Sequence, residues 1–203
     1  MKIPLRLLDL QKVKKTGRGY TRRELTVVKL LEELAAQQPV ASLLNVGFHD
    51  YQDIRTRWWI DICRANNIDW HILEIYPPNV ENFTKHAPAA DRHRITLGNL
   101  RDIGTLFTRK FDVFLHWHGP EHLEKEEFLG FLPDILRVTA RLVILGCPNG
   151  REDQGRAYGN PYEEHISFWT CADFQRLGFS TRTVDDKTPG HITACKHLPR
   201  TGK

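Results

Sequence analysis

Apolar positions divide the chain into short continuous runs, typical of buried strands, and longer segments with helical spacing. The runs that predict strands are residues 42–46, 70–75, 94–97, 111–117, 141–147, 179–184 and 192–196. Apolar residues spaced three and four apart predict helices at residues 24–36, 53–65, 100–107, 121–138 and 170–177. Pro77-Pro78 suits the first turn of one more helix. Strands and helices therefore alternate through most of the chain.

This alternation predicts an α/β fold. Parallel strands need crossover connections, and right-handed crossovers place the helices on both faces of the sheet. Only the short polar segment 185–190 separates the last two strands, which suits a hairpin and an antiparallel partner. We expect a doubly wound, mostly parallel seven-stranded sheet with an antiparallel C-terminal strand and helices on both faces.

Length and composition fit one such domain with a short N-terminal addition. The chain has 203 residues, of which 40% are hydrophobic and 27% charged. We expect residues 1–40 to form a basic N-terminal segment and a lid helix, and residues 41–200 to form the α/β domain. The basic segment suits contact with nucleic-acid phosphates or a solvated surface, and contains Lys12, Lys14, Lys15, Arg18, Arg22 and Arg23.

Several functional classes conflict with the sequence. The longest apolar runs are far shorter than the roughly 20 residues needed to span a bilayer, and no secretory signal is evident. We therefore expect a cytoplasmic protein without a membrane partner. No C-x-x-C pair is present, which argues against a zinc site or a disulfide framework, and we predict no metal; the cysteines are Cys63, Cys147, Cys171 and Cys195.

Candidate ligand-binding residues follow the predicted strands, because ligands of open α/β sheets bind at the carboxyl ends of strands. Gly47 allows a tight turn after the first strand. Glu74 ends the second strand within an apolar run, where its carboxylate suits the two hydroxyls of a ribose. After the third strand, the Asn99 amide suits an adenine amino group and Leu100 suits packing on the ring.

Histidines gather after the fourth predicted strand. His116, Trp117 and His118 end that strand, and His165 follows in a later loop. Imidazoles titrate near neutral pH and can act as general bases. His116 and His118 would point to opposite faces of a strand, which weakens a metal site built on that pair. Catalytic, structural and metal-binding roles all stay open on the sequence alone.

Together these segments resemble class I S-adenosylmethionine-dependent methyltransferases, from about residue 42 to residue 196. The residues that carry the resemblance are Leu44-Asn45-Val46-Gly47, Leu73-Glu74, Gly98-Asn99-Leu100, Asp112-Val113-Phe114-Leu115 and Glu121-His122-Leu123. The resemblance implies a Rossmann-like methyltransferase domain at residues 41–200. It also implies S-adenosylmethionine as cofactor and methyl transfer to an unidentified acceptor, for which we favour a small molecule.

The resemblance also assigns roles to individual residues. His118 and His165 are predicted to act as bases toward the acceptor, with Trp117 and Tyr20 as walls of its pocket. The residues predicted to bind the cofactor are Asn45, Gly47, Phe48, His49, Glu74, Ile75, Asn99, Leu100, His116 and Trp117.

The first motif departs from the family pattern of an acidic residue followed by x-Gly-x-Gly-x-Gly. Asn45 replaces the acid, only Gly47 is kept, and His49 and Tyr51 occupy the later glycine positions. Both side chains would crowd the methionine part of the cofactor unless the loop takes another path. One alternative is therefore a non-catalytic relative that binds nucleic acid or a protein. Another is a nicotinamide-dependent oxidoreductase, although no G-x-G-x-x-G is present to seat a pyrophosphate.

Overall fold

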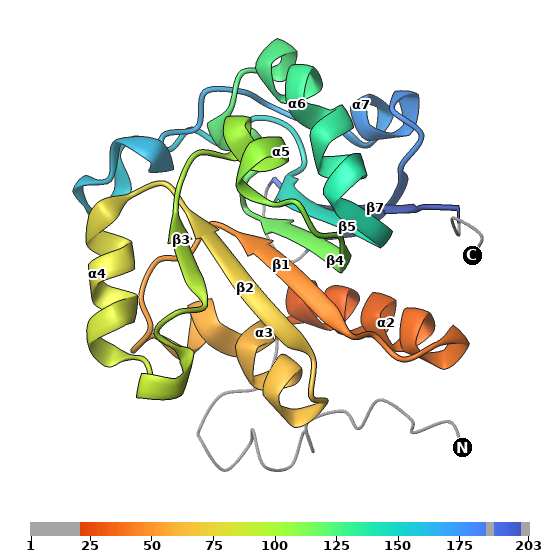
Figure 1. The fold of residues 1–203 in the computed structure, drawn as a ribbon. Coiled ribbons are helices and arrows are strands. Elements are labelled where there is room, and N and C mark those ends of the chain that lie inside the picture. The colour runs from red at the N-terminus through yellow and green to blue at the C-terminus, as the bar shows by residue number, and fades with distance from the viewer. Residues whose placement is uncertain (1–20, 186–188, 200–203) are drawn as a thin grey trace.

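The computed structural model describes residues 21–185 and 189–199, which form a seven-stranded sheet with helices on both faces (Figure 1). The order of the strands across the sheet is β3-β2-β1-β4-β5-β7-β6. Their bounds are β1 Ser42–Val46, β2 Asp69–Glu74, β3 Ile95–Leu97, β4 Phe111–Trp117, β5 Thr139–Pro148, β6 Ser180–Val184 and β7 His191–His197.

The directions of the strands confirm the predicted fold class. Strands β1 to β5 pair in parallel, and β7 lies antiparallel to both β5 and β6. The strand order reverses beside β1, so the carboxyl ends of β1 and β4 lie at the switch point of the sheet. In open α/β sheets this is the position that ligands occupy.

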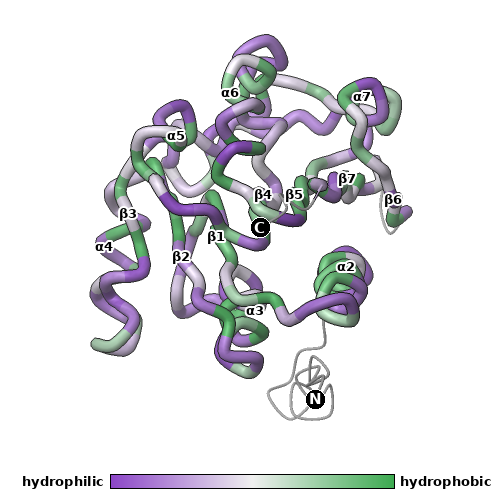
Figure 2. Tube along the Cα trace, turned by 45° about the vertical axis from the view of Figure 1, so that its right-hand side comes forward, coloured by the Kyte–Doolittle hydropathy of each residue, from purple (hydrophilic) through white to green (hydrophobic). Residues whose placement is uncertain are grey.

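Helices cover the sheet in two layers. The α-helices are α2 Arg22–Gln37, α3 Ile54–Ala65, α4 Pro77–His86, α5 Ile103–Leu106, α6 Lys125–Val138 and α7 Cys171–Arg176. None of the helices within the described ranges has both the length and the apolar character to cross a membrane. In Figure 2 each longer helix carries both hydrophobic and hydrophilic segments, as expected for helices with one face on a core.

Successive residues of a strand belong to two different parts of the core, one on each face of the sheet. Leu43 packs in one cluster with buried residues of α2, α3 and α4, whereas the next residue, Leu44, packs with α5, α6 and α7. Ile144 and Leu145 of β5 divide between the two clusters in the same way. Successive strand residues point to opposite faces, so an unbroken apolar run supplies both layers.

The predicted helix over residues 121–138 is interrupted. A 3-10 turn, Pro120–His122, comes first, and α6 begins only at Lys125. The carbonyl oxygen of Glu121 accepts hydrogen bonds from the backbone N–H groups of Ile166 and Ser167, at 2.9 and 3.1 Å. Because a continuous helix would use that carbonyl for residue 125, the contact with the later loop separates the two segments.

Candidate functional site

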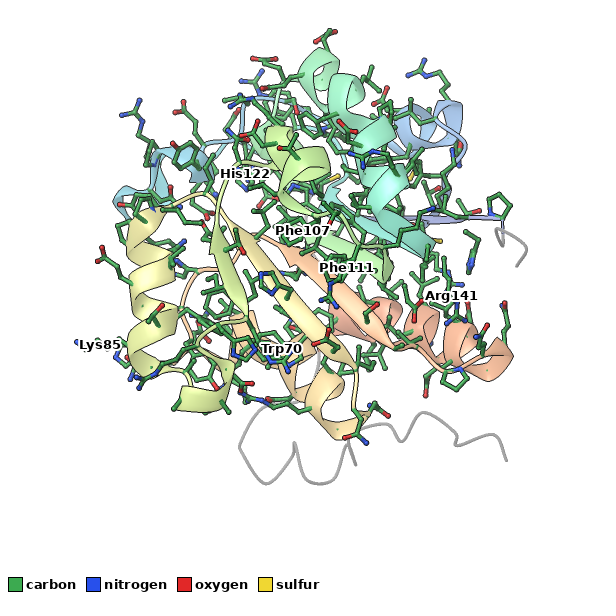
Figure 3. The ribbon with its side chains drawn as sticks, in the orientation of Figure 1. Trp70, Lys85, Phe107, Phe111, His122 and Arg141 are labelled. Atoms are coloured by element: carbon green, nitrogen blue, oxygen red, sulfur yellow. The ribbon has the colours of Figure 1, made fainter. Side chains whose placement is uncertain are left out.

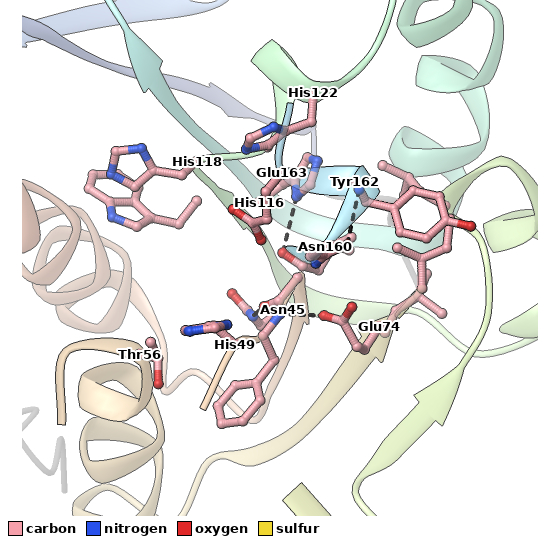
Figure 4. A pocket seen from close by; sticks show the side chains of 18 of the residues that line it. Asn45, His49, Thr56, Glu74, His116, His118, His122, Asn160, Tyr162 and Glu163 are labelled. Carbon is pink, nitrogen blue, oxygen red and sulfur yellow. Dashed lines mark hydrogen bonds between the residues drawn. The ribbon is translucent and has the colours of Figure 1, made fainter. Parts of the chain in front are cut away.

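A cavity of about 280 Å³ opens at the carboxyl ends of β1, β2 and β4 (Figure 4). All ten residues that the sequence predicts for the cofactor line it. Figure 3 labels His122, which also lines the cavity, at the carboxyl ends of the strands. Trp70, near the start of β2, and Arg141, near the start of β5, lie away from it. The cavity therefore lies at the predicted edge of the sheet.

The loop after β1 forms the turn that the glycine predicts. Gly47 has a φ of +87°, in the region that favours glycine. Its N–H donates to the carbonyl oxygen of Leu73 at 2.9 Å, and the Asn45 amide donates to the Gly47 carbonyl oxygen at 2.6 Å. Asn45, which stands in place of the family's acidic residue, thus stabilises the turn from within.

Tyr51 does not crowd the cavity, because the loop takes another path. Tyr51 is buried in the core, edge-on to Phe83 with ring centroids 5.4 Å apart, and its hydroxyl accepts a hydrogen bond from Arg64. The loop turns away from the cavity after His49, whose ring lines the cavity and lies 4.2 Å from that of Tyr158. Of the two bulky substitutions, only His49 therefore reaches the cavity.

Glu74 is a buried carboxylate fixed at the end of β2. One oxygen accepts the backbone N–H of Phe48 at 2.6 Å, and the other accepts that of Tyr76 at 2.8 Å. Burial raises the pKa of Glu74 to about 7, against the opposing effect of these hydrogen bonds. Each carboxylate oxygen can accept two hydrogen bonds, so capacity remains for two hydroxyls of a ligand.

The turn after β3 carries Asn99 and Leu100 to the cavity wall. The side-chain oxygen of Asn99 accepts the N–H of Arg101 at 3.0 Å and so caps the 3-10 turn Leu100–Asp102. The capping oxygen is the acceptor that an adenine amino group would need, and it keeps a second lone pair. Leu100 is buried and presents an apolar surface.

His116 is a buried side chain that joins two strands. Its Nδ1 lies 3.0 Å from the carbonyl oxygen of Val46, and burial lowers its pKa to about 4. The neutral ring therefore donates through Nδ1 and leaves Nε2 as an acceptor, for which the described residues provide no hydrogen-bond partner. A Cβ on Gly119 would lie 2.1 Å from this ring, so glycine is required there.

His118 lines the cavity just beyond the end of β4. Its φ is +53°, so its side chain does not follow the strand alternation that the sequence suggested. Its Nδ1 lies 3.4 Å from Oε1 of Glu121, and its side chain is 43% exposed. Burial raises the pKa of Glu121, but His118 and His122 lower it by more, so this carboxyl remains an anion near neutral pH.

His165 does not line the cavity with His118. Its Nδ1 lies 2.5 Å from the carbonyl oxygen of Glu152, and its ring centroid lies 5.0 Å from that of His122. His122 lines the cavity instead. Of the two predicted bases only His118 therefore lines the cavity, and His122, which the sequence analysis assigned only to a motif, lies between His165 and the cavity lining.

Two further groups of lining residues were not predicted. Arg55 and Thr56 come from the first turn of α3, which Asp53 caps. Asn160, Tyr162 and Glu163 come from the loop in which only His165 was selected. Asn160 is buried, and its side-chain oxygen caps a 3-10 turn by accepting the N–H of Tyr162 at 2.9 Å. In the sequence, the Asn-Pro pair before polar residues is the pattern that could have indicated this turn.

The position of α2 corrects the expectation of a lid helix. Val27, Leu30, Leu31 and Leu34 of α2 are buried in the core, and the helix contacts β6 and β7. No residue of α2 lines the cavity. The helix covers one face of the sheet because its apolar side is buried there. The basic segment before it, with Tyr20, lies outside the described residues.

Comparison with known proteins supports the fold rather than a close relationship. No family model matches the chain, and no curated protein matches its sequence. The chain is similar to the N-terminal domain of EvdMO1 with S-adenosylhomocysteine bound, at a TM-score of 0.59 and 15% identity, covering 88% of this chain and 82% of that one.

Two other solved structures have the same architecture. Magnesium protoporphyrin IX methyltransferase from Synechocystis PCC 6803, with bound S-adenosylmethionine, has a TM-score of 0.55 at 16% identity, covering 96% of this chain and 86% of that one. An S-adenosylmethionine-dependent methyltransferase from Archaeoglobus fulgidus has a TM-score of 0.52 at 13% identity. The match covers 93% of this chain and 99% of that one. Likeness at these identities establishes the fold alone, and the fold is that of S-adenosylmethionine-dependent methyltransferases.

Proposed function

We propose that this protein binds S-adenosylmethionine in the cavity and transfers its methyl group to a small-molecule acceptor. The observation that carries the proposal is the position of Glu74. It is a buried carboxylate at the end of β2, held beside the glycine turn that follows β1 and facing a cavity at the switch point. Buried charge is costly, and a ligand with paired hydroxyls would provide the carboxylate with donors.

The lining residues suit the separate parts of this cofactor. The Glu74 carboxylate would accept hydrogen bonds from the two ribose hydroxyls. Leu100 would pack on the adenine ring, and the side-chain oxygen of Asn99 would accept a hydrogen bond from the adenine amino group. Arg55, in the first turn of α3, is the cation that would face the carboxylate of the methionine part. The turn at Gly47 would let the cofactor approach the backbone closely.

Bound S-adenosylmethionine supplies a methyl group on a positively charged sulfur. In the transfer the bond from that carbon to sulfur would break as a bond to the acceptor atom formed, the electron pair would stay on sulfur, and an acceptor hydroxyl or amine would lose its proton. Alignment and exclusion of water assist such a displacement more than a nucleophilic side chain does. The largely apolar lining, which includes Trp58 and Trp117, supports this role.

His118 is the base that the geometry favours. Its ring lines the cavity, and Glu121, an almost completely buried carboxylate, lies 3.4 Å from its Nδ1. A carboxylate on one side of an imidazole orients the ring and stabilises the imidazolium formed when the ring takes a proton. His165 has no place in this step, because it does not line the cavity.

A cytoplasmic location, and nucleic-acid contact through the basic segment, stay predictions.

Calorimetry with S-adenosylhomocysteine tests the proposal. We expect the wild-type protein to bind it and Glu74→Gln to bind about 5- to 150-fold more weakly, which corresponds to roughly 1–3 kcal/mol for a mispaired buried polar group. Glu81→Gln, at an exposed position of α4, is the matched control and should bind as the wild type does. Absence of binding to the wild-type protein would refute the proposed function.

Turnover needs a separate assay. The protein would be incubated with S-adenosylmethionine carrying a labelled methyl group and with a panel of small hydroxyl, amine and thiol compounds. Labelled product and an equal amount of S-adenosylhomocysteine are expected for at least one class. Binding of S-adenosylhomocysteine without any transfer across the panel would favour the non-catalytic alternative.

A further inference from the structure

We propose that Glu121, His122 and His165 bind one divalent transition-metal cation at the edge of the cavity. Each offers one ligand atom, and these atoms all lie within 4.8 Å of one another. The first two residues belong to the 3-10 turn after β4, and the third to the loop after β5, which the Glu121 carbonyl oxygen holds through Ile166 and Ser167. Backbone hydrogen bonds thus bring the three ligands together.

The carboxylate of Glu121 points to a ligand at this position. Glu121 is 2% exposed, and neither of its oxygens accepts a hydrogen bond from any residue in the described part of the chain. The Nδ1 of His118 lies 3.4 Å from Oε1, at the outer limit of hydrogen-bonding distance. A buried carboxylate with both oxygens unsatisfied is costly, and a bound cation would satisfy them.

Both imidazoles are prepared for metal binding. The Nδ1 of His122 lies 3.1 Å from the carbonyl oxygen of Glu164, and the Nδ1 of His165 lies 2.5 Å from that of Glu152. A carbonyl oxygen can only accept, so each Nδ1 carries the proton and each Nε2 keeps its lone pair. Metal-binding histidines commonly show this arrangement, in which a backbone carbonyl fixes both the tautomer and the ring orientation.

The ligand types restrict the metal. Two imidazoles and one carboxylate suit Zn²⁺, Mn²⁺, Fe²⁺ or Co²⁺ better than Mg²⁺ or Ca²⁺, which prefer oxygen ligands. Ligands at about 2.0–2.2 Å from a tetrahedral Zn²⁺ lie about 3.4 Å from one another. The ligand atoms here lie within 4.8 Å of one another, so they would close by up to about 1.4 Å around a bound cation. Three protein ligands leave a position open for water or substrate.

The open position gives the site a use in the reaction. His122 also lines the cavity, so an oxygen atom of a molecule in the cavity could complete the coordination. This use rests on the proposed function, and it narrows the acceptor to a hydroxyl compound. A cation bound to the hydroxyl oxygen favours loss of its proton, which His118 would take, and the oxygen then attacks the methyl carbon as that carbon leaves sulfur.

The test is metal binding itself, measured without turnover. The protein would be treated with a chelator, dialysed and titrated with Co²⁺, whose visible absorption reports ligand number, and with Zn²⁺ by calorimetry. We expect about one cation per chain and at least a tenfold loss of affinity in both His165→Ala and Glu121→Gln. His93→Ala, at an exposed histidine before β3, should bind as the wild type does. Circular dichroism would check that each variant is folded.

The outcomes separate this site from the cofactor site. If the wild type takes up no Co²⁺ or Zn²⁺, or if His165→Ala and Glu121→Gln both bind as the wild type does, the metal site is refuted, whatever happens with S-adenosylhomocysteine. If the metal binds and both variants lose it while S-adenosylhomocysteine fails to bind the wild type, the metal site stands and the proposed function falls. Loss of metal binding with an unchanged affinity for S-adenosylhomocysteine supports both proposals.

Discussion

The Glu74 carboxylate accepts the backbone N–H of Phe48 at 2.6 Å, which joins the end of β2 to the loop that follows β1. Asn79 of α4 donates to the carbonyl oxygen of Phe48 at 2.7 Å, so both backbone groups of this loop residue are held. The carboxylate is therefore both a candidate ligand group and a support for the loop that shapes the cavity. Substitutions of Glu74 will report on both roles.

The affinity for S-adenosylhomocysteine should depend on pH through Glu74. Its pKa is raised to about 7 by burial, and hydroxyl donors from a ligand favour the ionised carboxylate. Ligand binding should therefore release a proton below pH 7, and affinity should fall by up to about tenfold per unit as the pH drops from 7 to 5. Calorimetry across that range checks this. In Glu74→Gln the slope should disappear, and an equal slope in the variant would assign the effect to another group.

The free energy of unfolding of the ligand-free protein should fall as the pH rises, whereas the affinity for the ligand falls as the pH drops. The pKa of Glu74 rises from its ordinary value of 4.5 to about 7 on folding, so the folded state binds more protons in this interval. The contribution is fully present below pH 4.5 and is lost as the pH rises through 7, by about 3 kcal/mol in total. Urea unfolding at pH 5 and pH 8 measures it as the difference between wild type and Glu74→Gln, in which the other titrating groups cancel.

His118→Asn should separate catalysis from cofactor binding. Asparagine tolerates the left-handed backbone at this position, where φ is +53°, so the loop should keep its path. We expect turnover to fall by about 10²–10⁴-fold, the usual effect of removing a general base, with the affinity for S-adenosylhomocysteine nearly unchanged. His165→Asn is the comparison: any loss of turnover there should follow its weaker metal binding and be reduced by excess cation, whereas the loss in His118→Asn should not. Equal turnover in His118→Asn and wild type would exclude His118 as the base.

Gly119→Ala should destabilise the protein and disturb the cavity. The added Cβ would lie 2.1 Å from the ring of His116, which is buried and cannot move freely. Overpacking of this kind typically costs about 1–3 kcal/mol. Gly130→Ala is the control, because its Cβ would meet nothing within 4 Å and it lies on the exposed side of α6. The control should be stabilised by up to about 1 kcal/mol, and urea unfolding of both variants measures the contrast.

The positions of the strands could be read from the sequence. The runs 42–46 and 111–117 match β1 and β4 because a strand covered on both faces needs apolar side chains in both directions. The same reasoning predicted the buried Glu74 at the end of β2. Parallel strands end at one edge of the sheet, so the residues after β1, β2, β3 and β4 were expected to meet, and those predicted for the cofactor do line one cavity.

The tertiary structure decided the paths of the loops. Tyr51 turns into the core beside Phe83, and the predicted helix over residues 121–138 is split, because the Glu121 carbonyl oxygen binds Ile166 and Ser167. That contact also brings His165 beside His122 and outside the lining of the cavity. Apolar periodicity records which side chains face a core, whereas hydrogen bonds between residues far apart in sequence leave no local pattern. The proposed metal ligands are brought together by such bonds, so only the folded chain reveals the cluster.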